Sequence, residues 1–595
     1  MTSTRASLKL STSCLQILSA SVALVGRCRG AGLAGAALGL SFAVHAQTPP
    51  AISAEQQRQI DQLNRLQQQR IPNPLPRAST LDLRILAPEK SAVPKAVDEL
   101  EFIVSGVDLE GASYFSKHEI DALFAPLLNR KVGVTALREA ANRLEQKYRD
   151  LGFFLVRVFL PPQQVTDGIF KIRVIEGRVS QVYVEGPDTA MNERVATFAR
   201  HLSDIRPLDL AGLERVLLII NDLPGVSAAG VLRPGAELGT SDLLLTVSPV
   251  RSSQLVTANN NGSQSTGPYS LSYIVTMQQP LKSPGQLNLS FTRSGTSSNH
   301  FEGVRNLAPR YSQELGSRGL MFSLGGTLSE SRPGGSLSSL GIQSNSAALA
   351  PRLRYALQRS RASSVYLEGG LALNSSKTTM AESVLTQDRS SVLDLAGSWV
   401  LNGWMDGTQS ISLGMSHGIA ALGAMDSQAL RPSTSDFKPR FLKFVLSLQR
   451  TQALPGQFSL AFSASGQYSG DRLLAGERLA FGGSAIGRGF PAGTISGDRG
   501  LGASLELTRP FKLGLDPAVS NFQVFVSTDS ASTRTNESTN IPATSAHLSS
   551  QALGVRFNVL TDTLVDLRIA RANQALVSDD PGRRKRLLIE VTKPF

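Results

Sequence analysis

The stretch QLNLSFTRS, residues 286–294, places leucine or phenylalanine at alternate positions, with asparagine, serine and threonine between them. Successive side chains of a β-strand point to opposite faces, so this stretch predicts a strand with one apolar and one polar face. The same alternation recurs at residues 441–449 and 457–465 and around Leu567. Short turns such as SPG (283–285) separate some of these segments. Strands of this kind are typical of an outer-membrane β-barrel, which contacts lipid outside and water inside.

The length of the alternating region sets the expected number of strands. No helix signal persists after residue 250, and about 345 residues remain. At about 10 residues per strand, eight strands would leave most of this region as loop, whereas sixteen leave turns of ordinary length. Residues 251–595 are therefore expected to form an all-β transmembrane barrel of about 16 antiparallel strands. The polar stretch 527–550 is expected to be one of its long loops, and the terminal Phe595 suits a closing strand.

The first 46 residues have the pattern of a secretory signal peptide. Arg5 and Lys9 precede the apolar run AGLAGAALGLSFAV, and Val44-His45-Ala46 provides a cleavage site before Gln47. The alternative is a membrane anchor, but the run is too short and too rich in glycine and alanine. Residues 1–46 are therefore predicted to be removed on export.

The charge and cysteine content exclude several classes of protein. Removing the four basic residues of the signal peptide lowers the net charge from +13 to +9, and these charges are spread along the chain. The dense run 583–586 is expected to be a solvated turn rather than a nucleic-acid site. Both cysteines, Cys14 and Cys28, lie in the signal peptide, so the mature chain has no disulfide and no zinc–cysteine site.

Residues 52–70 predict a helix with an unusually polar surface. Ser53 and Gln56 have the spacing of a capping box, and only Ile60, Leu63 and Leu66 form an apolar edge. Such a helix cannot anchor a core and should lie in water or in a wet channel. The segment 71–98 contains five prolines and is expected to be an extended linker.

Two α+β modules are expected between the linker and the barrel. In residues 99–178 the predicted order is strand, helix, helix, strand, strand. Ser116 and Glu119 predict a capping box for the first helix, and Thr135 is expected to cap the second. That second helix is expected to bury one apolar face, formed by Leu137, Ala141, Leu144, Tyr148 and Leu151. Residues 179–250 repeat the pattern in shorter form, with helices near 190–203 and 208–222.

The sequence contains no motif that predicts an enzyme. The sequence GMSHG (414–418) matches the hydrolase pattern G-x-S-x-G, but it ends an alternating segment and no helix follows it. The six histidines lack metal-ligand spacing. Gly487, Gly489 and Gly493 miss the dinucleotide spacing. We expect neither catalysis nor a cofactor or metal.

The stretch FGGSAIGRGFPAG, residues 481–493, has five glycines and a single charge, Arg488. Glycine permits close backbone approach, so this loop is able to fold back between barrel walls. A buried guanidinium there requires a carboxylate partner, and its planar fork favours a two-bond contact. Composition alone leaves open a mobile surface loop with a solvated Arg488.

Three segments resemble one known family. Residues 152–179, with Pro161-Pro162-Gln163 and Glu176-Gly177, resemble the polypeptide-transport-associated (POTRA) module of the two-partner secretion transporters of the ShlB/FhaC (TpsB) type. Residues 213–247 resemble the second module of these transporters. Residues 481–507 resemble their signature barrel loop, with Arg-Gly-Phe at 488–490. The resemblance extends over nearly the whole mature chain.

This resemblance implies the domain order and the site. The order is signal peptide (1–46), plug helix (52–70), Pro-rich linker (71–98), POTRA 1 (99–178), POTRA 2 (179–250) and barrel (251–595), with the signature loop at about 481–502. The implied loop latch is Arg488, Gly489, Phe490 and Asp529, and the implied loop scaffold is Gly482, Gly483, Gly497, Asp498 and Gly500. Glu506 also stands at its expected place. Asp529 departs from the family pattern, since Ser527 and Ala531 replace the aromatic and the glycine that usually flank this aspartate.

The implied function is export of one large exoprotein (TpsA type) through an outer-membrane pore with periplasmic N-terminal modules. The implied further partners are outer-membrane lipid and the barrel assembly machinery, with no nucleic acid. Two alternatives remain: a factor that inserts other barrels into the membrane, and a passive porin or receptor. An assembly factor usually has more modules, and a porin has no use for periplasmic ones.

Overall fold

The computed structural model describes residues 82–85, 101–263, 267–280, 284–295, 303–512, 519–560, 562–574 and 585–595. The predicted signal peptide (1–46), plug helix (52–70) and nearly all of the linker (71–98) lie outside this part of the chain. Within it, no helix is both long enough and apolar enough to cross a membrane.

The first module combines two helices with two small sheets. Strand β6 (Ile169–Ile175) lies between β3 (Gly106–Glu110), which is parallel to it, and β5 (Arg157–Phe159), which is antiparallel. Strands β2 (Glu101–Ile103) and β4 (Lys131–Gly133) pair separately. Helices α3 (Lys117–Phe124) and α4 (Val134–Asp150), with a 3₁₀ turn at Ala125–Leu127, complete the module. Their buried side chains, among them Phe124, Leu144 and Tyr148, pack against Ile172 of the sheet.

The predicted elements of this module are mostly confirmed. Ser116 and Glu119 form the capping box of α3. Thr135 is not a cap, because α4 begins one residue earlier and Gly133 occupies its N-cap without a side-chain hydrogen bond. Leu151 is 51% exposed, since it follows the last turn of the helix. The strand expected from residue 99 divides into β2 and β3, because the buried Val104 and its neighbour Ser105 interrupt it.

The second module has one four-stranded sheet covered by two helices. The strand order is β1 (Leu83–Ile85), β8 (Val226–Pro234), β9 (Thr240–Pro249) and β7 (Arg178–Glu185). Helices α5 (Thr189–Ala199) and α6 (Leu210–Asn221) flank a 3₁₀ segment, Arg200–Asp204. Strand β1 comes from the predicted linker and runs parallel to β8, with Leu83 opposite Gly230. The edge of β8 thus pairs with an extended segment of the same chain.

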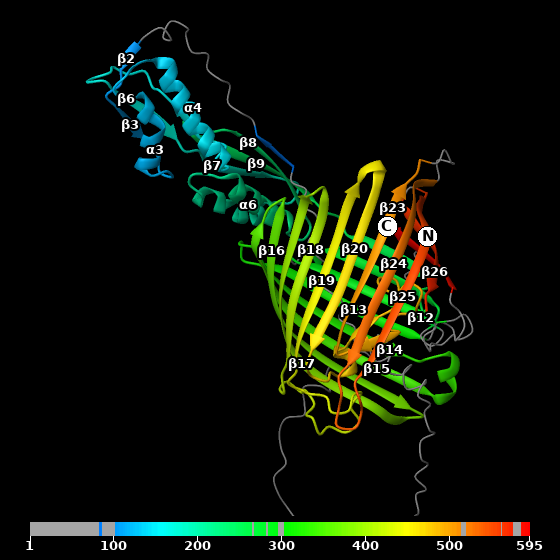
Figure 1. Ribbon diagram of the computed structural model, residues 1–595. Coiled ribbons are helices and arrows are strands. Elements are labelled where there is room, and N and C mark those ends of the chain that lie inside the picture. Colours follow the sequence, from blue (N-terminus) through cyan, green and yellow to red (C-terminus); the bar gives the residue numbers. More distant parts are fainter. Residues whose placement is uncertain are drawn as a thin grey trace, which may run out of the picture. The chain divides into compact units, whose positions relative to one another are not determined.

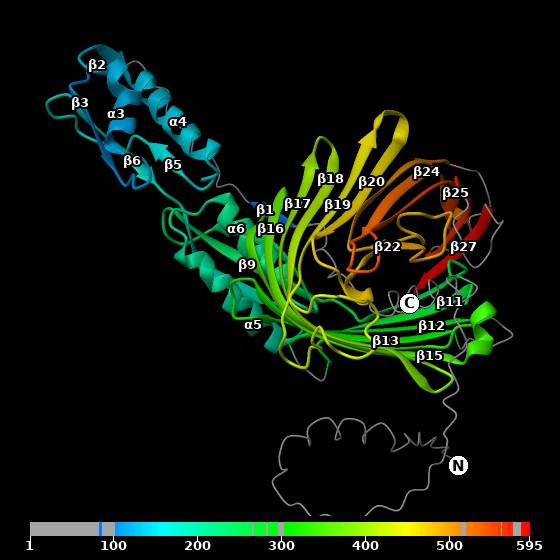
Figure 2. The same ribbon diagram turned by 60° about the horizontal axis from the view of Figure 1, so that its bottom comes forward.

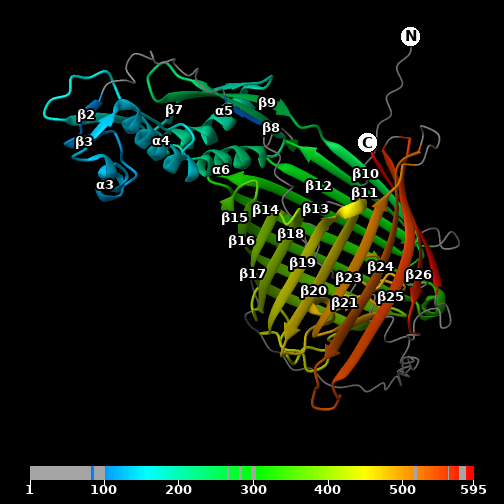
Figure 3. The ribbon, with the colours of Figure 1, turned by 45° about the horizontal axis from the view of Figure 1, so that its top comes forward.

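Among the described residues, sixteen antiparallel strands form a closed barrel, which confirms the expected number (Figures 1 and 3). Strand β27 pairs with β10 and closes it. The strands are β10 (Ser253–Asn259), β11 (Tyr269–Gln278), β12 (Gln286–Gly295), β13 (Val304–Leu315), β14 (Leu320–Ser331), β15 (Ile342–Arg359), β16 (Ser363–Met380), β17 (Ser383–Trp404), β18 (Gly407–Gly418), β19 (Leu442–Leu454), β20 (Phe458–Ser469), β23 (Arg499–Pro510), β24 (Val519–Thr535), β25 (Thr544–Val559), β26 (Thr563–Ala572) and β27 (Lys585–Pro594).

The barrel strands follow the alternation seen in the sequence. Outward side chains such as Phe291 and Ile569 are exposed, while the intervening polar residues Asp566 and Arg568 are buried on the inner side. The stretch 527–550 is not mainly a loop, because β24 continues to Thr535 and β25 begins at Thr544. Its inward positions carry buried polar and small residues, so the polar composition that predicted a loop belongs to strands facing the interior.

Candidate functional site

The loop between β20 and β23 folds into a compact hairpin. Its short strands β21 (Leu479–Phe481) and β22 (Ile495–Gly497) pair antiparallel, and Figure 2 shows β22 within the ring of barrel strands. At the tip, Gly482 and Gly483 adopt φ angles of +115° and +95°, which residues other than glycine rarely adopt. Their N–H groups donate to the carbonyls of Ile486 and Phe490. The glycines thus serve a tight turn rather than a mobile surface loop.

The tip of the hairpin holds Arg488 against the inner wall of the barrel. Arg488 is only 8% exposed. Its Nη1 donates to Asp529 Oδ1 on β24 at 2.7 Å and to Ser504 Oγ on β23 at 2.9 Å. Its Nη2 donates to Glu506 Oε2, also on β23, at 3.0 Å. The guanidinium therefore binds two carboxylates on two neighbouring strands.

The structure brings Arg488 and Asp529 together, but not with the geometry expected from the sequence. Asp529 binds one guanidinium nitrogen of Arg488, while its Oδ2 accepts from the backbone N–H of Arg488 at 2.9 Å. Ser550 Oγ on β25 also donates to Oδ2, at 3.0 Å. The expected two-bond fork is absent because the second guanidinium nitrogen is directed to Glu506. Asp529 itself is 1% exposed and fixes both the side chain and the backbone of Arg488.

A charge network extends from Glu506 along the barrel wall. Glu506 accepts from both terminal nitrogens of Arg556 on β25, and Arg556 Nε donates to Asp566 on β26 at 2.7 Å. The Arg556 guanidinium lies 3.9 Å from the ring centroid of the buried Phe525. Arg568 Nε lies 3.1 Å from Asp566 Oδ1. Four strands of the wall are thus connected by ion pairs that begin at the loop tip.

Gly489 and Phe490 fit the tip against the wall. A Cβ on Gly489 would lie 2.7 Å from the backbone nitrogen of Ala572 and 2.9 Å from Ser550 Cβ, so only glycine permits this approach. Phe490 is 4% exposed and belongs to an apolar cluster. The cluster combines the loop residues Phe481, Ile486, Phe490 and Ile495 with the wall residues Ala531, Leu548 and Ala572.

The remaining predicted scaffold residues lie where the loop rejoins the barrel. A Cβ on Gly497 or on Gly500 would lie 2.5 Å from the β24 backbone. Asp498 is fully buried and accepts from the N–H groups of Leu473 at 3.0 Å and Asn536 at 2.8 Å, and from Arg478 Nε at 3.2 Å. These contacts fasten the end of the hairpin to the tip of β24.

Sequence reasoning missed several residues of this site. Ser504 precedes Glu506 by two positions on β23, so strand alternation places both on the same face and could have identified Ser504. Arg556 and Asp566 also occupy inward positions of alternating strands. Lys443 also occupies an inward position of the alternating segment 441–449, but its pairing with Glu477 has no signal in the sequence, because the two residues lie 34 positions apart.

The hydrolase-like stretch GMSHG does not form the geometry of a hydrolase site. The GMSHG stretch lies within β18, where His417 pairs with Leu442 of β19, so no nucleophile elbow forms. The described residues contain no group of three or more potential metal-ligating histidines, cysteines or carboxylates. The ion pairs and close packing instead attach the loop to the inner wall of the barrel.

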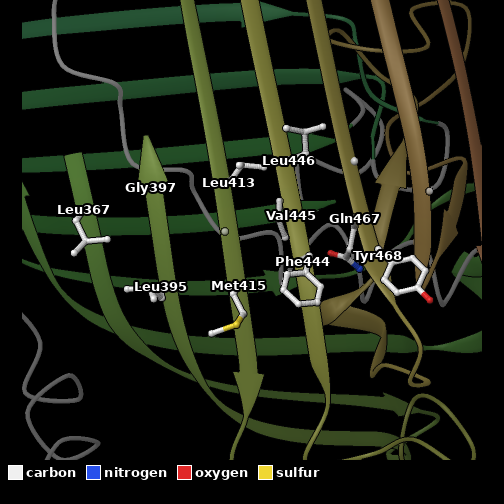
Figure 4. A pocket seen from close by; sticks show the side chains of 13 residues that line it. Leu367, Leu395, Gly397, Leu413, Met415, Phe444, Val445, Leu446, Gln467 and Tyr468 are labelled. Atoms are coloured by element: carbon white, nitrogen blue, oxygen red, sulfur yellow. The ribbon is translucent and has the colours of Figure 1, made fainter. Parts of the chain in front are cut away.

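The outer wall carries an apolar hollow of about 560 Å³ (Figure 4). Exposed side chains that line it include Leu395, Leu413 and Tyr468, and a Cβ added at the exposed Gly397 would have no atom within 4 Å. It lies on the apolar outer face of the strands, separate from the loop site.

Comparison with known proteins identifies the family. The sequence pattern of the family described as "Haemolysin secretion/activation protein ShlB/FhaC/HecB" matches residues 239–557, and that of the ShlB-type POTRA domain matches residues 102–177. The chain belongs to this family. It is a two-partner secretion transporter of the outer membrane with periplasmic POTRA modules, and not an enzyme. The expectation of a secretion transporter is thus confirmed, and the assembly-factor and passive-porin alternatives gain no support.

Relatives within the family agree with this assignment. The heme/hemopexin transporter protein HuxB of Haemophilus influenzae (strain 86-028NP) is 25% identical over 64% of this chain and 67% of its own. The outer membrane transporter CdiB of Escherichia coli O6:K15:H31 (strain 536 / UPEC) is 26% identical over 75% of each chain. The solved structure of CdiB from Escherichia coli has a TM-score of 0.69 at 23% identity and covers 91% of this chain and 98% of its own. This likeness supports the same fold.

Proposed function

We propose that this transporter captures one large, unfolded exoprotein with its two modules and passes it through the barrel. During export, the ion pairs of Arg488 hold the hairpin loop in the state that permits passage; we call this contact the Arg488 latch. Relatives are described as transporters for heme/hemopexin and hemolysin. The cargo proposed here is a secreted exoprotein of that general class. Outer-membrane lipid would contact the apolar outer face, and the barrel assembly machinery would insert the strands.

The single observation that carries the latch is the burial of Arg488 between Asp529 and Glu506, at 2.7 and 3.0 Å. Removing one partner of a buried ion pair typically costs about 3–5 kcal/mol. A loss of this size is sufficient to release a loop, whereas the barrel itself is closed by backbone hydrogen bonds around its whole circumference. The latch is therefore able to change state without unfolding the pore.

Comparison of secreted proteins tests the transport function. A strain lacking this gene should lose one large protein from its culture medium, and a plasmid copy of the gene should restore it. A broad loss of other outer-membrane barrels would indicate an assembly role instead. An unchanged set of secreted proteins under conditions that express the gene would contradict the proposal.

A further inference from the structure

A second buried ion pair lies at the base of the hairpin loop, away from the latch. Lys443 on β19 and Glu477, at the end of the 3₁₀ segment Ala475–Glu477, approach to 2.8 Å between Nζ and Oε2. Their side chains are only 8% and 3% exposed. Two charges removed from water to this extent require full compensation by hydrogen bonds.

Hydrogen bonds compensate both buried charges at the base of the loop. Lys443 Nζ also donates to the carbonyl of Glu477 at 3.0 Å, while Glu477 Oε1 accepts from Asn374 at 3.2 Å and from Ser390 at 3.1 Å. Gln467 on β20 donates to the same carbonyl at 3.1 Å. Glu477 is thereby joined to strands β16, β17, β19 and β20.

The latch at the tip differs in two respects. Within the described part of the chain, Arg488 Nε has no hydrogen-bond partner although it is buried. Beside it lies a polar cavity of about 310 Å³, lined by Ser484, Arg488 and charged residues of the wall such as Arg568 and Glu590. An unsatisfied donor and an adjoining space give the tip both a weaker hold and room to move.

We propose that the Lys443–Glu477 pair is the fixed attachment of the loop to the barrel wall. The tip that carries Arg488 is fastened to the wall and released from it while this attachment stays in place. This inference rests on the proposed export function, because it explains how one end of the loop is able to change position while the other stays on the wall. Lys443 and Glu477 act through Arg488 and are positioning residues.

The matched substitution is Lys443→Met, which keeps the length of the side chain but leaves the Glu477 carboxylate buried and unpaired. Arg352→Met is the control, because Arg352 pairs with Glu368 at 3.0 Å and with Asp394 at 3.3 Å in a partly buried setting on the inner wall. Lys443→Arg keeps the charge and should retain more function than Lys443→Met.

Spin-label distances in the full-length purified protein test the inference directly. Glu382, in the turn between β16 and β17, carries the reference label as Glu382→Cys. Its distance to a label at Gly470→Cys reports on the base, and its distance to a label at Ala485→Cys reports on the tip. All three positions are exposed. Both native cysteines lie in the predicted signal peptide. Arg488→Ala should broaden the tip distribution only, Lys443→Met should broaden the base distribution, and Arg352→Met should change neither. Equal broadening of both distributions in Arg488→Ala, or an unchanged base in Lys443→Met, would overturn the inference.

Secretion provides the second readout. With equal amounts of heat-modifiable protein in the membrane, Lys443→Met should lower export by about tenfold or more, consistent with an unpaired buried charge. Wild-type export by this variant would overturn the positioning role. If the labels move as expected but Arg488→Ala exports normally, the latch function fails while the fixed attachment stands.

Discussion

At the scale of single residues, Arg488 divides its hydrogen bonds unequally between two acids. Asp529 accepts from its side chain and its backbone, whereas Glu506 accepts from one nitrogen and is also held by Arg556. Asp529→Ala should therefore reduce secretion more strongly than Glu506→Gln, since the glutamine oxygen still accepts hydrogen bonds. Secretion at matched membrane levels measures the difference. Normal export by Asp529→Ala beside a defective Arg488→Ala would make Asp529 the wrong partner.

Glu176 is a single residue on which the first module depends. Its carboxylate accepts from the N–H groups of Ser113 and Tyr114, the hydroxyl of Ser113 and the hydroxyl of Tyr148. Burial acts to raise the pKa of Glu176, but the hydrogen bonds from Ser113, Tyr148 and Tyr114 outweigh it and hold the pKa below its usual value.

A lowered folded-state pKa has a defined pH signature. The stabilisation by Glu176 should be complete above the unfolded value of about 4.3 and should be lost as the pH falls through the folded value. Glu176→Gln should cost about 1 kcal/mol at neutral pH, after allowance for its partial exposure, and should reduce the loss of stability in acid. Thermal unfolding of fragment 99–250 at pH 7 and pH 3 measures both. Glu110→Gln, at an exposed pair with Arg173, is the control; an equal effect there would contradict the role of Glu176.

At the scale of elements, we expect the two modules to bind an unfolded client at a sheet edge. An extended chain binds such an edge through backbone hydrogen bonds and side-chain pockets. The pairing of β1 with β8, in which Gly230 N–H donates to the Asp82 carbonyl at 2.9 Å, shows that one edge accepts a parallel segment. Fragment 47–250 should retain the unfolded N-terminal region of the partner in a pull-down, but not an unrelated unfolded protein. Failure to retain it would count against strand addition.

The predicted plug helix gives a second test at this scale. If residues 52–70 occupy the pore, as their polar surface suggests, their deletion should raise single-channel conductance and antibiotic entry while the barrel still assembles. Planar-bilayer recordings of the purified deletion variant measure this. Conductance equal to that of the intact protein would identify these residues as a periplasmic tail.

Elements differ in how much of them the sequence could predict. Alternation located the barrel strands because one face of each meets lipid and the other meets water. The same reasoning wrongly predicted a loop at residues 527–550, because the parts of β24 and β25 in this stretch carry mainly polar and small side chains. The N-cap of α4 was also misassigned, because threonine and glycine are both common N-cap residues, and only the backbone shows that the helix begins after Gly133.

At the scale of the whole molecule, the strand number followed from length, and the latch residues followed from the resemblance of the loop. Arg488 and Asp529 lie 41 positions apart in sequence and meet only because the hairpin folds inward. The ion pair between Lys443 and Glu477 was beyond reach for the same reason, since neither residue belongs to a motif. Contacts that depend on the path of a loop through the barrel cannot be read from periodicity.

Export by the Arg488→Ala variant tests the central claim most directly. The exported partner should be quantified in the medium of cells that contain equal amounts of wild-type or variant protein in heat-modifiable form. The account predicts that secretion is abolished or strongly reduced, and that Arg488→Lys rescues it poorly, because an ammonium group lacks the planar fork that reaches Asp529 and Glu506 together. Export at the wild-type level by Arg488→Ala would contradict the latch.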